Sequence, residues 1–466
     1  MVDLPDIQTT EEGREYEKNI MMVLSGEKKD YPSYFGGFMI ASGVEFDVIS
    51  PIDETIKFGI FQEPEDGIML EAVTSAVKAQ KEWAKVPSAE RAAYFEMPLR
   101  TIEARRLFYA AAVTVATGMA REDALLEVDR LIEIMRKAIA DGKAGIKGDP
   151  TGVWAVISAH NSPLAAPAGY AVAAMVAGNS VIMNPSRYCP SPLYMFYSLA
   201  EKAGLPGGVL NLIVDTRDKT TDDLANDMRV AGVVAAGSGE RLEDLMFLQV
   251  DDELGFINEI KGMNPAIVYH PADMKAAARA VAESAFAYSG QRPFSCSKVI
   301  VTADEQRKFL DALTAEVGKI VISDPVNDTT FSGPIISRKS EERYRALLAE
   351  NAGFIVAKAD PSEDSPMGPY VPFAVLAGLD DENDLSFMDS GFPILNVKVV
   401  DSLDDAFFEL ENTECGLSAG IFSKDQKAIG RFEEEADAPL RFVNKSSRSL
   451  APGIWAVAER FTKRSA

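Results

Sequence analysis

The chain has 466 residues, of which 47% are apolar and 25% charged, a composition typical of folded globular proteins. Its formal net charge of −24 argues against nucleic acid or an anionic membrane as a partner, because both need a basic surface. Three cysteines and two histidines predict neither a disulfide framework nor a metal site. With no secretory signal and no long apolar run, we expect a cytoplasmic protein that spans no membrane.

The length predicts two or three domains. Apolar residues recur three and four positions apart between residues 70 and 140, which predicts successive amphipathic helices. Short apolar runs then alternate with helical stretches, and this alternation predicts βαβ units in a doubly wound parallel sheet. The expected strands are residues 152–157, 180–183 and 209–214, and the expected helices are residues 163–177 and 192–203.

A second α/β series begins near residue 264 and continues to about residue 422. Its first strands are expected at residues 266–269 and 298–301, and its first helices at residues 274–288 and 305–322. Neither a low-complexity linker nor a short repeat separates the two series. We therefore expect two sheet-based domains packed together, with a small-molecule ligand in the cleft between them.

Several long motifs, in a fixed order along the chain, resemble those of one known family. They are Asn161-Ser-Pro, Ala177-Gly-Asn-Ser-Val-Ile-Met-Asn-Pro-Ser, Ala203-Gly-Leu-Pro-Gly-Gly-Val-Leu-Asn, Glu259-Ile-Lys-Gly-Met-Asn-Pro, Gly290-Gln291 and Cys415-Gly-Leu-Ser-Ala-Gly. They resemble the aldehyde dehydrogenase superfamily over nearly the whole chain. The resemblance implies an α/β fold with a Rossmann-type cofactor domain (1–138 and 153–258), a catalytic domain (259–438) and a small β oligomerisation element (139–152 with 439–466).

The same resemblance implies NAD- or NADP-dependent oxidation of a small aldehyde. Asn161 matches the asparagine that binds the oxyanion, and Glu259 matches the general base. The family's Gly-Gln-x-Cys is replaced by Gly290-Gln-Arg-Pro293, so proline stands at the place of the nucleophile and supplies neither a thiol nor a backbone N–H. Cys296, three residues on, is the remaining candidate. Pyrroline-carboxylate dehydrogenases carry a second, non-catalytic cysteine at this offset, so both a catalytic and a structural role stay open.

The cofactor positions implied by the resemblance are altered at several places. Ser158 and Gly237-Ser238 are expected near the dinucleotide, where the Gly-Ser pair opens a helix whose N-terminal amides face the pyrophosphate. Asn184 replaces the lysine that holds the adenosine ribose, and Leu242 replaces a small residue. NAD or NADP binding is nevertheless the cofactor expectation.

Cations and a shortened carboxylate mark the expected reaction centre. Asp389 replaces the glutamate that holds the nicotinamide ribose. Lys261 occupies the first position of a Gly-Gly pair that lets the nicotinamide approach. Lys261, Arg292 and Arg448 together favour a carboxylate-bearing substrate, although three solvent-facing cations on an acidic protein would have the same sequence.

Three functions fit the sequence. The first is an NAD(P)-dependent aldehyde dehydrogenase that recruits Cys296. The second is a catalytically silent relative that binds a ligand or serves in an assembly. The third is non-redox chemistry in which Glu259 acts as an acid or base on an anionic substrate. The resemblance also implies a homodimer or a tetramer.

Overall fold

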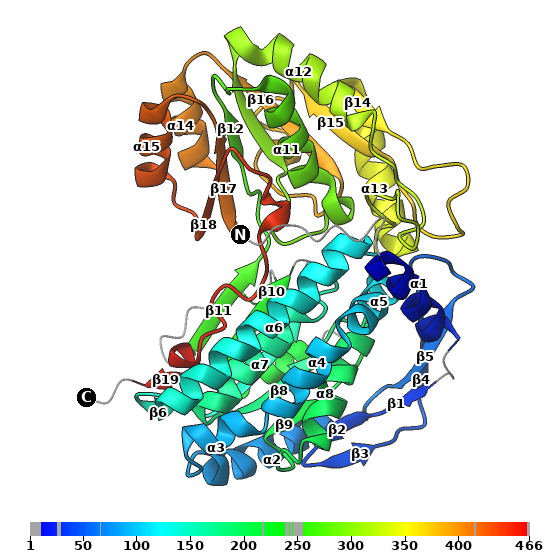
Figure 1. Ribbon diagram of the computed structural model, residues 1–466, viewed down its shortest axis with the longest axis vertical. Helices are drawn as coiled ribbons and strands as arrows, with labels where there is room; N and C mark the ends of the chain where they lie inside the picture. Colours follow the sequence, from blue (N-terminus) through cyan, green and yellow to red (C-terminus); the bar gives the residue numbers. More distant parts are fainter. Residues whose placement is uncertain are drawn as a thin grey trace.

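The computed structural model describes residues 11–25, 29–65, 67–216, 219–237, 242, 245, 255–413 and 416–463. The chain forms two lobes, each built on a seven-stranded sheet (Figure 1). The helices of the first lobe are α1 (Glu11–Leu24), α2 (Ile68–Trp83), α3 (Ser88–Ala93), α4 (Glu96–Ala104), α5 (Arg106–Thr117), α6 (Arg121–Ala144), α7 (Ala165–Ala177), α8 (Ser191–Lys202) and α9 (Lys219–Ala225).

The first sheet has the strand order β11-β10-β7-β8-β9-β2-β3. The five strands from β11 to β9 run parallel, and β2 and β3 close one edge antiparallel. These strands are β2 (Ser33–Phe35), β3 (Phe38–Ile40), β7 (Val153–Ser158), β8 (Ser180–Asn184), β9 (Leu210–Leu212), β10 (Val230–Gly237) and β11 (Gly255–Ile260). Helix α2 covers one face, and helices α7 and α8 cover the other, with α6 packed outside α7. Every residue of β7 is buried, which is why it reads as a continuous apolar run.

The second sheet has the order β14-β15-β16-β13-β12-β17-β18, with only β14 antiparallel to its neighbour among these strands. Helices α11 and α12 pack on one face, while α14 and α15 cover the other. The elements are β12 (Ala266–Val268), α11 (Met274–Phe286), β13 (Lys298–Thr302), α12 (Ala303–Val317), α13 (Arg338–Glu350), β14 (Ile355–Ala359), β15 (Phe373–Ala377), β16 (Ile394–Val400), α14 (Leu403–Asn412), β17 (Ser418–Phe422), α15 (Gln426–Glu435) and β18 (Leu440–Val443).

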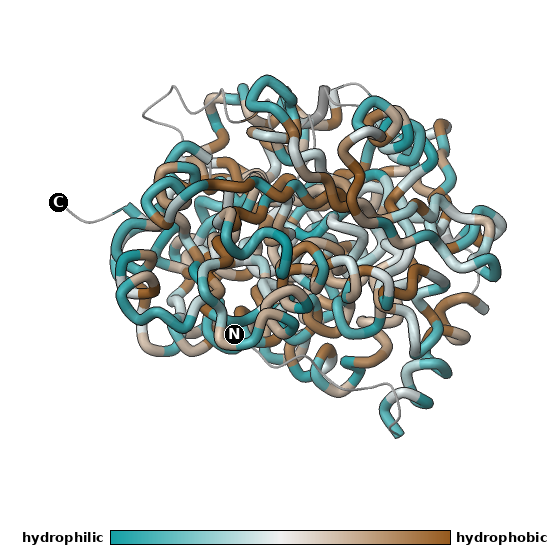
Figure 2. Tube along the Cα trace, turned by 90° about the horizontal axis from the view of Figure 1, so that it is seen from above, coloured by the Kyte–Doolittle hydropathy of each residue, from teal (hydrophilic) through white to brown (hydrophobic). Residues whose placement is uncertain are grey.

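Short strands and 3-10 turns complete the described chain. An N-terminal three-stranded sheet has the order β1-β5-β4, and a two-stranded ribbon joins β19 to β6. Apolar segments gather in the interior and hydrophilic segments lie toward the outside (Figure 2). These pieces are β1 (Lys29–Tyr31), β4 (Glu45–Ile49), β5 (Lys57–Gln62), β6 (Asp149–Pro150), β19 (Thr462–Lys463), η2 (Ala287–Gly290), η3 (Ala352–Phe354), η4 (Asp384–Ser386), η5 (Ser447–Ser449) and η6 (Ala458–Phe461).

The expected alternation of strands and helices is confirmed in both lobes, but two boundaries differ. A β-ribbon was expected over residues 139–152, whereas α6 continues to Ala144 and only Asp149–Pro150 is extended. Gly142 lies inside this helix. A Cβ there would lie 2.7 Å from Ala92 and Val176, so this glycine serves close packing and not a turn. Strand β18 pairs with β17, so it belongs to the second sheet and not to the oligomerisation element.

Across the described parts of the chain, no helix is both long enough and apolar enough to cross a membrane. The same part of the chain holds no group of three or more histidine, cysteine or acidic side chains arranged to bind a metal ion.

Candidate functional site

The site lies where the carboxyl ends of β7, β10 and β11 face the loop that follows α11 in the second lobe. Gly237 ends β10 with a φ of 123°, and a Cβ on it would lie 2.5 Å from Asn161 Oδ1. Lys261, directly after β11, donates its backbone N–H to Gly237 O at 2.7 Å. Asn161 Nδ2 donates to Gln291 O at 2.8 Å. The fold thus brings three separate predicted motifs together.

Glu259 is held by the C-terminal segment. Its side chain is fully buried, and its Oε1 accepts the Gly453 N–H at 2.6 Å while its Oε2 accepts the Ile454 N–H at 3.2 Å. The Tyr170 hydroxyl also donates to Oε2. Burial raises the pKa of Glu259 to about 7, against the lowering effect of these hydrogen bonds. That pKa suits a general base, but the oxygens are already engaged inside the chain.

The loop containing Pro293 is tied down by polar contacts. Asn264, with a left-handed φ of 48°, donates through Nδ2 to Pro293 O at 2.9 Å and to Ser295 O at 3.1 Å. Its Oδ1 accepts the N–H groups of Leu417 and Ser418 at 2.9 and 2.8 Å. One asparagine therefore fixes the proline against the start of β17, and a shift of this loop by several ångströms would break its two hydrogen bonds to Asn264.

Cys296 lies in the core of the second lobe. It is 1% exposed, its backbone N–H donates to Ser284 O at 2.9 Å, and its Sγ contacts Lys298 O at 3.2 Å. Burial raises the pKa of its thiol to about 12. Cys189 is buried as well, with a thiol pKa also raised to about 12 by burial. Neither environment favours the thiolate that nucleophilic attack needs. Cys415 lies outside the described residues.

The cofactor positions fit a dinucleotide unevenly. Gly237 permits the close approach of two loops that any larger residue would block, as the phosphate end of such a site requires. Ser158 ends β7 beside it, and Ser238 lies outside the described residues. Asn184, at the end of β8, donates through Nδ2 to Ile213 O at 2.9 Å, and Leu242 is buried. The backbone at the phosphate end therefore fits.

Lys261 and Asp389, the two residues predicted beside the nicotinamide, form an internal ion pair. Lys261 Nζ lies 2.7 Å from Asp389 Oδ2 and 2.9 Å from Oδ1, with side chains 1% and 8% exposed. The same ammonium donates to Gly290 O at 2.9 Å. The two residues expected to contact ligand thus contact each other.

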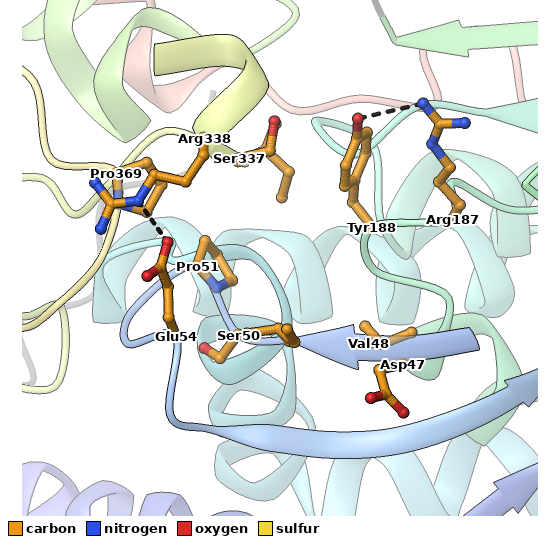
Figure 3. A pocket seen from close by; sticks show the side chains of 12 residues that line it. Asp47, Val48, Ser50, Pro51, Glu54, Arg187, Tyr188, Ser337, Arg338 and Pro369 are labelled. Atoms are coloured by element: carbon orange, nitrogen blue, oxygen red, sulfur yellow. Dashed lines mark hydrogen bonds and ion pairs between the residues drawn. The ribbon is translucent and has the colours of Figure 1, made fainter. Parts of the chain in front are cut away.

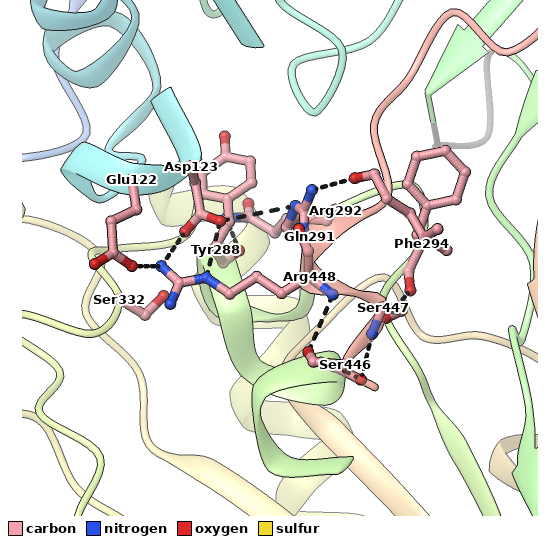
Figure 4. Close-up of polar contacts among 12 residues, drawn as sticks. Glu122, Asp123, Tyr288, Gln291, Arg292, Phe294, Ser332, Ser446, Ser447 and Arg448 are labelled. Carbon is pink, nitrogen blue, oxygen red and sulfur yellow. Dashed lines mark hydrogen bonds and ion pairs between the residues drawn. The ribbon is translucent and has the colours of Figure 1, made fainter. Parts of the chain in front are cut away.

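Arg448 is paired with acidic residues of the first turn of α6 (Figure 4). Its guanidinium donates to both Asp123 oxygens at 3.2 and 3.1 Å and lies 2.9 Å from Glu122 Oε2. The nearby carboxylates raise the pKa of Arg448 above its usual range despite burial. Arg292 donates to Leu450 O at 2.7 Å and to Arg448 O, and lies 3.9 Å from Asp123 Oδ1. Burial lowers the pKa of Arg292. Both arginines are therefore committed to internal partners, not to solvent.

Sequence reasoning missed Asp123, Glu127, Tyr170 and Asn264. Glu127 is buried one turn beyond Asp123, and its Oε2 accepts the Ala165 N–H at 2.9 Å. Burial raises the pKa of Glu127 to about 7. Acidic residues four positions apart on the buried face of α6 were the available signal, because unpaired carboxylates are costly to bury.

A cavity of about 380 Å³ lies between the two lobes (Figure 3). Its walls come from β4, the loop after β8 and the start of α13. Arg187 donates to Thr216 O at 2.6 Å, and Arg338 pairs with Glu54 and Glu341. The cations of this cavity are therefore also paired within the chain.

Known proteins resemble this chain in sequence and in fold. A 1-pyrroline-5-carboxylate dehydrogenase of Geobacillus sp. (strain WCH70) is 24% identical, over 97% of this chain and 92% of that one. An alpha-ketoglutaric semialdehyde dehydrogenase of Bacillus subtilis (strain 168) is 28% identical, over 91% of each. The solved structure of 1-pyrroline-5-carboxylate dehydrogenase from Thermus with bound NAD has a TM-score of 0.88 at 19% identity, covering 97% of this chain and 92% of that one.

A model of the aldehyde dehydrogenase family matches residues 39–454, which is nearly the whole chain. These relatives are named as dehydrogenases of 1-pyrroline-5-carboxylate and of a semialdehyde, the Thermus structure is named with bound NAD, and the family uses NAD or NADP. With the fold, the order of the motifs and this match in agreement, the chain belongs to the aldehyde dehydrogenase family.

Proposed function

We propose that this chain is a catalytically silent member of the family: a protein that keeps the NAD(P)-dependent dehydrogenase scaffold and binds a small ligand without oxidising an aldehyde through a cysteine. One observation supports the proposal. The reactive groups expected at the site are engaged inside the chain: Asn161 with Gln291 O, Glu259 with two backbone amides, and Lys261 with Asp389.

Aldehyde oxidation in this family needs a reactive thiolate at the site. Hydride transfer from an aldehyde in this family proceeds after a thiolate adds to the carbonyl. Pro293 offers no thiol at the expected place, and Cys296 is buried with a pKa raised to about 12. At neutral pH such a thiol holds a negligible thiolate fraction. The first step of the covalent route therefore has no competent nucleophile among the described residues.

The proposed ligand is a small aldehyde or carboxylate, the class to which the substrates named for the relatives belong. The net charge of −24 supports a small-molecule partner over nucleic acid. We also propose a cytoplasmic homodimer or tetramer. The ribbon of β6 with β19 supports this, because its two short strands form a separate sheet apart from either lobe's sheet.

A second function is favoured by one specific observation, the pKa of about 7 at Glu259. A buried carboxyl in that range can exchange a proton with a bound ligand near neutral pH without any redox step. This alternative requires the C-terminal segment to release Glu259 from Gly453 and Ile454.

The test is a turnover assay on the purified full chain with NAD and with NADP. The substrates are a panel of aldehydes that includes α-ketoglutaric semialdehyde, together with the cyclic imine 1-pyrroline-5-carboxylate. We expect no reduced cofactor from the wild type or from Cys296→Ser. Peptide mass spectrometry after iodoacetamide treatment at pH 8 should find Cys296 unmodified, because its thiol is buried.

Two results would change the conclusion. Robust reduction of NAD that Cys296→Ser removes would show a working dehydrogenase and overturn the proposal. Conversion of a substrate without cofactor reduction, lost in Glu259→Gln and kept in Cys296→Ser, would select the acid–base alternative.

A further inference from the structure

Lys261 joins three segments that are far apart in the sequence. Its backbone N–H is bound to Gly237 O at 2.7 Å, at the end of the first sheet. Its ammonium is bound to Gly290 O and to Asp389 in the second lobe, at 2.7 to 2.9 Å. The side chain therefore spans the space between the phosphate end of the site and the loop that leads to Pro293.

The backbone around Lys261 has little freedom to move. A Cβ on Gly416 would lie 2.3 Å from Gly262 N, so these two glycine segments are in close contact. The lysine N–H is itself held by Gly237. A ligand that enters this space must therefore move the lysine side chain, whose flexible four-carbon stem permits it, and not the main chain.

Moving the Lys261 side chain away from Asp389 costs free energy. The side chains of Lys261 and Asp389 are 1% and 8% exposed, so separating them leaves two charges with little access to water and no charged partner. A ligand recovers that cost only if it supplies new partners, such as ribose hydroxyls for Asp389. The apparent affinity of such a ligand is therefore low when only a small fraction of molecules has the pair open, and it rises with that fraction.

We propose that the Lys261–Asp389 ion pair is a gate on the nicotinamide half of the dinucleotide site. NAD or NADP seats its nicotinamide ribose only after Lys261 releases Asp389. A ligand that ends at the pyrophosphate, such as ADP, does not meet the gate. The gate concerns binding alone and does not rest on the proposed loss of thiol chemistry, which the turnover assay tests separately.

Isothermal titration calorimetry on the full chain tests the gate with NAD, NADP and ADP as probes. Lys261→Gly removes the side chain and restores a Gly-Gly pair. We expect it to bind NAD or NADP at least about tenfold more tightly than the wild type does, with ADP affinity unchanged. Lys261→Met, which removes the charge but keeps the bulk, should gain less than the glycine variant.

Lys298→Met is the matched control. Lys298 is also a buried lysine, paired with Glu409 and bonded to Ser386 O at 2.9 Å, but it has no contact with Gly237. The control should leave NAD affinity unchanged. If Lys261→Gly melts before the titration temperature, Lys261→Gly/Asp389→Asn takes its place, because it leaves no buried unpaired carboxylate.

The gate is overturned if removing the lysine leaves NAD and NADP affinity unchanged. An equal gain for ADP also overturns it, because the effect would then not be confined to the nicotinamide half. Tight binding of NAD by the wild type, equal to that of the glycine variant, excludes the gate as well, even if no aldehyde is oxidised.

Discussion

Glu259 and Glu127 are two buried carboxyl groups near the reaction centre, and burial raises the pKa of each from the ordinary 4.5 to about 7. Their charges also act on each other, since the negative charge of Glu259 raises the pKa of Glu127. Arg292, the Tyr170 hydroxyl and four backbone amides oppose this rise without cancelling it. These two carboxyl groups therefore bind protons more tightly in the folded chain than in the unfolded chain.

The raised pKa values of Glu259 and Glu127 predict how the free energy of unfolding depends on pH. Between about pH 4.5 and about pH 7 the folded chain binds more protons at these groups than the unfolded chain does. Their contribution to the free energy of unfolding is thus fully present below about pH 4.5 and is lost as the pH rises through about 7. Urea denaturation at pH 5.5 and pH 7.5 measures it.

Glu259→Gln and Glu127→Gln isolate the effect, because other carboxylates titrate equally in wild type and variant. Each variant should show a smaller loss of stability than the wild type between the two pH values, by about 1 kcal/mol or more. Parallel pH profiles for wild type and both variants would refute the raised pKa values.

At the scale of elements, the segment that follows β18 is a strap across the site. Arg292 and Arg448 hold it to the loop after α11 and to α6, and its Gly453 N–H binds Glu259. The acidic first turn of α6 also interacts favourably with the positive end of its own helix. The strap thus couples the last part of the second lobe to the first lobe.

The Arg448–Asp123 contact should dominate the stability of this strap. Arg448→Gln leaves Asp123 buried without its bidentate partner, so we expect a loss of about 3–5 kcal/mol in the free energy of unfolding. Chemical denaturation measures the loss. The double variant Arg448→Gln/Asp123→Asn should lose less, because no lone charge remains buried.

Arg431→Gln is the matched control on the surface. Arg431 pairs with Asp404 and Glu435, and these side chains are 34%, 86% and 50% exposed. Its loss should cost less than about 1 kcal/mol. Equal losses for Arg431→Gln and Arg448→Gln would mean that the buried pair has no special role.

At the scale of the whole molecule, two sheets face each other with their strand ends toward one inter-lobe region. The Asn161–Gln291, Glu259–Gly453 and Arg448–Asp123 contacts all cross that region. The surface outside it is strongly acidic on balance, since the chain carries a net charge of −24. That charge opposes self-association at low salt and weakens with screening.

The proposed homodimer or tetramer has a direct measurement. Sedimentation equilibrium should give twice or four times the chain mass of 50.5 kDa, with tighter association at 0.3 M salt than at low salt. A mass of 50.5 kDa at both salt concentrations would contradict it.

Much of the fold was readable before the structure. The strands near residues 153, 181 and 299 were predicted because each is a short apolar run, and buried parallel strands need that pattern. The expected aldehyde-dehydrogenase-like fold is confirmed by the family match and by the solved structures. The end of α6 was missed because the resemblance assigned residues 139–152 to a β element, whereas tight packing holds Gly142 inside the helix.

The candidate site, like the fold, could be predicted from the sequence only in part. Sequence motifs located Asn161, Glu259 and Pro293, and the structure places these segments around one region, while their roles stay predictions. The expected anion-binding role of Lys261 and Arg448 also stays a prediction, but each cation already has a carboxylate partner inside the chain.

The sequence by itself determined the elements, the family and the absence of a thiol at position 293, because periodicity and motif wording are local properties of the chain. Only the tertiary structure decided what the polar side chains of the site contact. Lys261 and Asp389 are 128 residues apart in the sequence, and Asp123 and Arg448 are 325 apart. Such pairs form only when the folded chain brings distant segments together and burial makes an unpaired charge costly.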